Sequence, residues 1–69
     1  MEHVFAKTLI IIEVTELFAQ KYKLTMNEAR DLFYSSKTIE LLDDDETGLY
    51  GQSGLYVFSL FEEEYHKSQ

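Results

Sequence analysis

The feature that most constrains this fold is the apolar pattern of residues 4–22. Its apolar side chains recur three, four or seven positions apart, at Val4, Ile10, Ile11, Val14, Leu17, Phe18 and Tyr22. This spacing is typical of one side of an α-helix and predicts a helix of about five turns. The β-branched run Ile10 to Ile12 would also suit a buried strand, but the length of the period and the absence of turn residues before Lys23 favour the helix.

The apolar arc of this helix is wider than contact with one neighbour requires, because Phe5, Leu9, Ile12 and Ala19 fall on a flank of the stripe. The helix is therefore expected to be central or shared with a second copy. A chain of 69 residues also buries only about 60% of the surface that its unfolded form exposes, so association would add burial. We predict that the chain forms a homo-oligomer, namely a homodimer, with its interface at Ile11, Phe18 and Tyr22.

Capping signals indicate where the next two helices begin. Thr25 followed by Glu28 is a capping-box pattern, which predicts that a second helix begins at Met26. Ser36 can cap a third, shorter helix. The acidic run Asp43 to Glu46 should end that third helix, because carboxylates oppose the negative end of a helix dipole.

A loop with two glycines, Gly48 and Gly51, should follow, and each glycine can take a positive φ there. Ser53 can then cap a fourth helix, from Leu55 to about His66, with Glu62 to Glu64 on its outer face. Residues 1–69 are thus predicted to form a single all-α domain, a small bundle of three to four helices. The expected core includes all five phenylalanines: Phe5, Phe18, Phe33, Phe58 and Phe61.

The charge balance excludes several classes of partner. Six Lys and Arg against thirteen Asp and Glu give a net charge of −7, which disfavours nucleic acid and anionic membrane surfaces. Glu13 and Glu16 interrupt the apolar N-terminal run, so we expect neither a signal peptide nor a membrane span. Cytoplasmic localisation is the resulting expectation.

Few residues are arranged for chemistry. The chain has no cysteine, which excludes disulfides, zinc–thiolate sites and thiol nucleophiles. His3 and His66 lie near opposite ends of the sequence, and the glycines around Ser53 do not have the spacing of an esterase elbow. We therefore expect no enzymatic activity, no catalytic residues and no cofactor.

One local pattern suggests a metal ion as an alternative. Oxygen ligands at positions one, three and five, followed by glycine at six, begin a calcium-binding helix–loop–helix, and the chain has these types at Asp43, Asp45, Thr47 and Gly48. Position twelve, which should be a bidentate glutamate, is Gly54, and position eight is Tyr50. A calcium-responsive helical module is thus the second hypothesis.

The leading hypothesis is a protein-interaction module. Residues 37–69 carry two basic and eight acidic side chains, a balance of −6 that suits a basic protein partner. Tyrosines near the acidic run can add apolar contact area with a polar tip. The predicted partner-binding residues are Asp43, Asp44, Asp45, Glu46, Tyr50 and Tyr56.

Residues 47–53 read T-G-L-Y-G-Q-S. Together with the N-terminal apolar helix and the acidic last helix, this element resembles a family of short, uncharacterised bacterial proteins with a T-G-L-Y-x-x-S signature, sometimes encoded near toxin-like genes. The resemblance implies a partner-binding or antitoxin-like role and a structural use of the loop, in which Gly48 provides backbone geometry and Leu49 or Tyr50 packs inward. Gly54 stands where that family pattern suggests proline.

Overall fold

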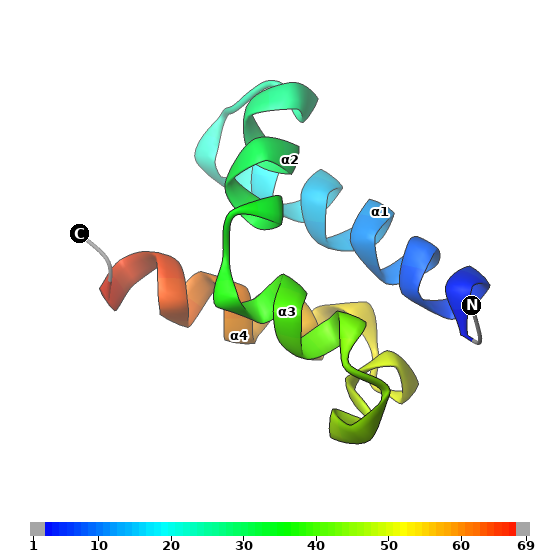
Figure 1. Ribbon diagram of the computed structural model, residues 1–69. Helices are drawn as coiled ribbons and strands as arrows, with labels where there is room; N and C mark the ends of the chain where they lie inside the picture. Colours follow the sequence, from blue (N-terminus) through cyan, green and yellow to red (C-terminus); the bar gives the residue numbers. More distant parts are fainter. Residues whose placement is uncertain (1–2, 68–69) are drawn as a thin grey trace.

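A computed structural model describes residues 3–67 of the predicted domain. Four α-helices account for most of this part of the chain: α1 (Val4–Tyr22), α2 (Met26–Tyr34), α3 (Lys37–Asp43) and α4 (Gly54–Lys67) (Figure 1). Two short 3₁₀ turns, η1 (Asp45–Thr47) and η2 (Leu49–Gly51), connect α3 to α4. No strand occurs within residues 3–67, so the prediction of a small all-α bundle is confirmed.

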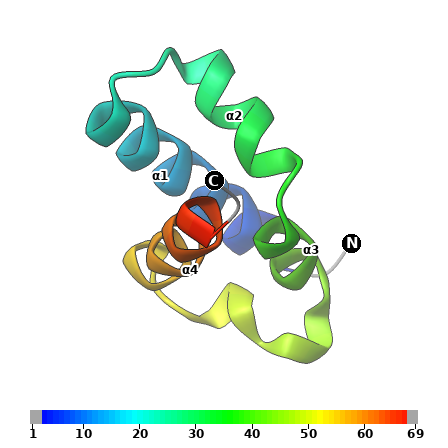
Figure 2. The ribbon, with the colours of Figure 1, turned by 90° about the vertical axis from the view of Figure 1, so that its left-hand side faces the viewer.

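The longest helix, α1, organises the bundle. It packs against both α2 and α4, and α3 packs against α4. Figures 1 and 2 show α2 folding back beside the C-terminal half of α1, with the turns η1 and η2 at the opposite end of the molecule from the α1–α2 connection. Within the described residues, no helix has the length and apolar character needed to cross a membrane.

The predicted caps are present. The Thr25 hydroxyl accepts a hydrogen bond from Glu28 N at 3.1 Å, and the Glu28 carboxylate accepts one from Thr25 N at 2.9 Å, which completes the capping box. Ser36 Oγ accepts from Ile39 N at 3.1 Å at the start of α3, and Ser53 Oγ accepts from Tyr56 N at 3.1 Å at the start of α4. These bonds satisfy backbone donors that helix termini leave without partners.

The loop of residues 47–53 is held by its own side chains. Thr47 Oγ1 donates to Leu41 O at 2.6 Å and accepts from Leu49 N at 3.1 Å. Gly48 has φ +68°, a conformation that favours glycine, and Leu49 is buried. Gly48 therefore provides the backbone geometry of the loop and Leu49 packs inward, as expected. Gly51 does not have a positive φ.

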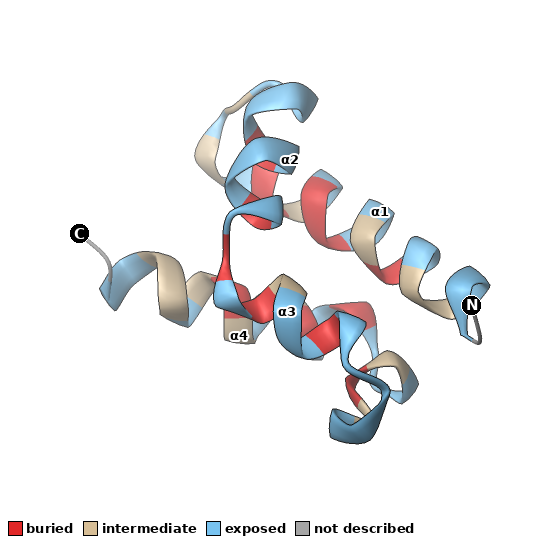
Figure 3. Cartoon of the chain, in the orientation of Figure 1, coloured by how far each residue is buried: buried red, intermediate tan, exposed pale blue. Residues whose placement is uncertain are grey.

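The core lies where α1, α2, α3 and α4 face one another (Figure 3). At its centre the Phe18 ring lies 4.7 Å from that of Phe61 and 4.9 Å from that of Tyr65, measured between centroids. Aromatic rings at such separations bury large areas and prefer tilted or edge-to-face contacts. The buried apolar residues are Ile10, Val14, Phe18, Ala19, Ala29, Phe33, Leu42, Leu49, Val57 and Phe61.

The expectation that every phenylalanine is buried is wrong. Phe5 is 76% exposed, and Phe58 is only half-buried. The reason for Phe5 is the difference in helix length: α1 has 19 residues, whereas α2 has nine and returns along the C-terminal half of α1. The outward side of the first turns of α1 is therefore left uncovered.

Candidate partner-binding surface

The acidic run forms an exposed corner between α3 and η1. Asp43 is the last residue of α3, Asp44 is the N-cap of η1, and all four residues from Asp43 to Glu46 are exposed. Asp44 Oδ1 accepts a hydrogen bond from Glu46 N at 3.0 Å. The Asp43 side chain is 87% exposed. The sequence prediction thus placed these carboxylates correctly on the surface.

One cation from the N-terminal half reaches this corner. Lys7 Nζ lies 2.6 Å from Asp45 Oδ1, and it donates to the main-chain oxygen of Asp43 at 2.9 Å. The hydrogen bond with Asp45 raises the pKa of Lys7, and the same bond lowers the pKa of the Asp45 carboxyl. Asp45 is therefore held by α1 and its side chain is 48% exposed, whereas Asp43, whose Oδ1 lies 3.9 Å from Lys7 Nζ, is 87% exposed.

The two predicted tyrosines have different surroundings. The Tyr50 ring stacks on His3, with 3.8 Å between centroids and 17° between ring planes, so it fastens η2 to the start of α1. Tyr56 lies in the first turn of α4 and is 48% exposed, beside Leu55 at 63%. Tyr56 is thus the tyrosine that a partner could reach more easily.

The residues predicted for the dimer interface face the interior of the single chain. Phe18 has no exposed surface, so its assignment to an interface between copies is wrong: it packs against α4 instead. Ile11 is half-buried, as is Tyr22. The Tyr22 hydroxyl donates to Glu62 Oε2 at 2.7 Å and lies 2.8 Å from His66 Nε2. The wide apolar arc of α1 was identified correctly, and Ile10, Val14 and Phe18 are buried as part of it, but the interface was assigned to the side that faces the interior.

Sequence reasoning missed the polar cluster that joins the end of α1 to α4. Glu62 forms an ion pair with Lys21 and accepts the Tyr22 hydrogen bond, and both contacts, Lys21 first, lower the pKa of its carboxyl. The hydrogen bond to Glu62 is also the main reason that the pKa of Tyr22 is raised to about 12. A tyrosine with this pKa is poorly suited to exchange protons near neutral pH, so the cluster is better suited to fastening helices. The spacing of Glu62 and His66, four positions apart, indicates that the two share a face of α4, but no signal in the sequence pointed to Tyr22.

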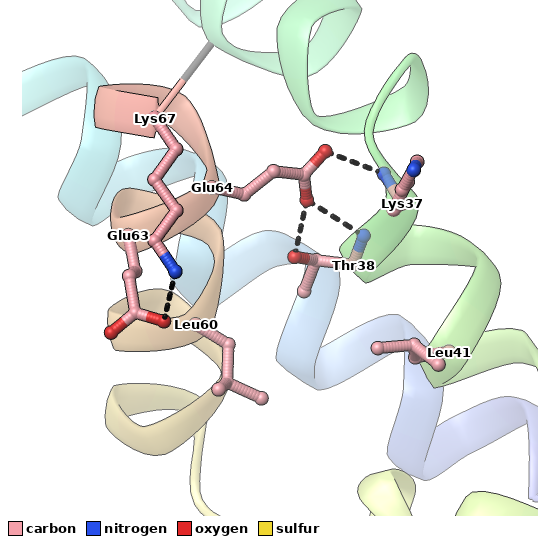
Figure 4. Close-up of a pocket in the computed structure, with 7 residues that line it drawn as sticks. All are labelled: Lys37, Thr38, Leu41, Leu60, Glu63, Glu64 and Lys67. Atoms are coloured by element: carbon pink, nitrogen blue, oxygen red, sulfur yellow. Dashed lines mark hydrogen bonds and ion pairs between the residues drawn. The ribbon is translucent and has the colours of Figure 1, made fainter.

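An open groove of about 400 Å³ lies between α3 and α4 (Figure 4). The Glu64 carboxylate on one wall accepts hydrogen bonds from Lys37 N at 2.7 Å, Thr38 N at 2.9 Å and Thr38 Oγ1 at 2.7 Å. Burial acts to raise the pKa of Glu64, but these bonds outweigh it and lower the pKa below its usual value. Contrary to expectation, Glu62 and Glu64 are half-buried and only Glu63 is exposed. The residues lining the groove are Lys37, Thr38, Leu41, Leu60, Glu63, Glu64 and Lys67.

The structure gives the calcium hypothesis no assembled site. Lys7 contacts the oxygens of Asp43 and Asp45, and Gly54, the twelfth position of the pattern, begins α4. Among residues 3–67, no three His, Asp or Glu side chains are grouped closely enough to hold a metal ion. Calcium binding stays a prediction from the sequence.

Comparisons with known proteins add no assignment: no known protein family, curated protein or solved structure matches the chain. The similarity to the family with the T-G-L-Y-x-x-S signature also stays a prediction.

Proposed function

We propose that this protein is a non-enzymatic interaction module that binds a basic protein partner through its acidic C-terminal half, in an antitoxin-like or regulatory role. The observation that carries the proposal is the exposed corner at Asp43 to Glu46, where four carboxylates lie together and Lys7 pairs with two of them, Asp43 and Asp45. A surface of one sign attracts a partner of the opposite sign, speeds encounter and disfavours wrong pairings.

We assign two different roles to the four carboxylates of this corner. Asp44 and Asp45 have the closer partners in the chain, Glu46 N at 3.0 Å and Lys7 at 2.6 Å, so they shape the corner, whereas Asp43 Oδ1 lies 3.9 Å from Lys7 Nζ. Asp43 and Glu46 are assigned to the partner's lysines or arginines. Tyr56 is assigned to the apolar part of the contact because this residue is 48% exposed.

Capture of partners from a native host extract tests the proposal. Three immobilised proteins are compared: the wild type, an Asp43→Asn/Glu46→Gln double variant, and a control with Glu16→Gln and Asp31→Asn. The control loses the same two charges from exposed positions of the N-terminal half. A basic protein should be retained by the wild type and the control, lost by the double variant, and eluted by moderate salt.

Equal retention on all three columns would contradict the assignment of Asp43 and Glu46. Retention of neutral or acidic proteins alone would contradict the basic character of the partner. A wild-type column that retains nothing would remove the proposed function.

A further inference from the structure

One segment of α1 is apolar all round the helix. Leu9, Ile10, Ile11 and Ile12 are consecutive, and successive residues of an α-helix are rotated by about 100°, so these four point in all directions. The fold covers only part of this circumference: Ile10 is buried and Ile11 half-buried, whereas Leu9 is 50% and Ile12 48% exposed. A helix that is apolar on every side is normally buried on every side.

The uncovered side chains form one strip. Phe5, Leu9 and Ile12 are spaced by four and three positions, so they share a face of α1, and Phe5 is 76% exposed. We call these three residues the α1 strip. It is about 10 Å long along the helix axis, from the rise per residue.

We propose that the α1 strip binds the α1 strip of a second copy, with the two helices antiparallel about a twofold axis near Leu9. In this arrangement Leu9 contacts Leu9 of the other copy. The Phe5 ring of each copy contacts Ile12 of the other copy. A contact of this kind is self-complementary and closes at two copies. It uses none of the residues assigned to the basic partner, so either proposal can fail alone.

The charges next to the strip favour the antiparallel direction. Glu16 is exposed and continues the strip toward the C-terminal end of α1, four positions after Ile12. Antiparallel packing separates Glu16 from its counterpart by about 20 Å, beyond a Debye length of about 8 Å. Parallel packing would set the same carboxylates side by side.

The available area predicts a weak dimer. The strip and its flanks offer on the order of 500 Å² per copy, or about 1,000 Å² in total, which is near the lower limit for a specific interface. Each copy also carries a net charge of −7, so the two copies repel at long range. We therefore expect dissociation in the micromolar range, with tighter association at higher salt.

Cross-linking tests the position and direction of the contact, and the absence of native cysteine makes single-cysteine variants unambiguous. Leu9→Cys is compared with Leu41→Cys, a leucine of similar exposure, 47%, on α3. With a short thiol-reactive cross-linker, the Leu9→Cys protein should form covalent dimers several-fold faster. A mixture of Phe5→Cys and Ile12→Cys proteins should cross-link faster than either alone.

Sedimentation equilibrium of the wild type, Leu9→Glu and Leu41→Glu, with circular dichroism as a check of folding, completes the test. The wild type and Leu41→Glu should show a dimer at high concentration, and Leu9→Glu should stay a monomer. A wild-type mass that stays at the monomer value at every concentration would overturn the proposal, as would equal cross-linking at positions 9 and 41. If Leu9→Glu instead lost the captured basic protein, the strip would belong to that partner.

Discussion

At the scale of single residues, the surroundings of Tyr22 raise the pKa of its hydroxyl. Its hydroxyl lies between Glu62 and His66, and the hydrogen bond to the Glu62 carboxylate, with partial burial, raises the pKa from 10.0 to about 12. A raised tyrosine pKa means that folding favours the neutral form. Its contribution to stability is therefore complete below pH 10 and is lost as the pH rises toward 12.

Tyrosinate absorbance measured against pH checks this environment. Tyr22 should ionise near pH 12, and Tyr22→Phe should remove that late step. Tyr34→Phe is the control, because this tyrosine on α2 is 53% exposed, and the late step should remain. A wild-type curve without a late step would show that the hydroxyl is not held by Glu62.

At the scale of elements, α3 depends on contacts with the rest of the chain. It has seven residues, too few for a helix to be stable by itself in water. Its first backbone donors are satisfied by Ser36 and, from α4, by Glu64, whose carboxylate accepts from Lys37 N and Thr38 N. A carboxylate at this end also interacts favourably with the helix dipole.

Replacing Glu64 by glutamine should destabilise the fold by about 1 kcal/mol, the usual cost of losing a good cap, as measured by chemical denaturation at neutral pH. The amide can still accept a hydrogen bond, but it brings no charge and turns its NH₂ group toward other donors. Glu63→Gln, on the next residue, is the control: its side chain is 69% exposed and pairs only loosely with Lys67, at 3.6 Å. Equal effects of the two variants would argue against capping by Glu64.

The pH dependence follows from the sign of the shift. The pKa of Glu64 is lowered in the fold from 4.5, so its charge stabilises the native state fully above pH 4.5 and progressively less as the pH falls through the lowered value. The difference in stability between the wild type and Glu64→Gln should therefore shrink in acid.

At the scale of the whole molecule, stability comes from one aromatic core. Phe18 of α1 contacts Phe61 of α4, and Phe61 contacts Phe33 of α2, so three helices meet through three rings. A domain of this size has a small margin of stability. Loss of one central ring therefore affects the entire fold rather than one helix.

Phe18→Ala should cost about 3–5 kcal/mol and leave much of the protein unfolded, as followed by circular dichroism during denaturation. Phe5→Ala makes the same chemical change on the same helix, at a side chain that is 76% exposed, and should change monomer stability by less than about 0.5 kcal/mol. Similar losses in both variants would mean that Phe5 is covered in solution.

The comparison of Phe5 with Phe18 also shows how much of the burial pattern can be predicted from the sequence. The two residues have the same chemistry, lie on the same helix and fit the same wide apolar arc, yet one is exposed and the other has no exposed surface. The periodicity of α1 cannot separate them, because burial depends on where α2 ends and how α4 crosses α1. The same is true of Glu62 and Glu64, which were expected to face solvent and instead bind Tyr22 and the start of α3.

The sequence by itself determined the elements. The apolar spacing predicted the extent of α1, and Thr25, Ser36 and Ser53 predicted where the later helices begin. Both signals can be found in the sequence because a cap and a helical period depend on residues within about four positions of one another. It also determined the acidic character of the corner at Asp43 to Glu46. Only the tertiary structure decided which side of α1 stays open and which carboxylates are already held within the chain, because those contacts join residues as much as 36 to 44 positions apart.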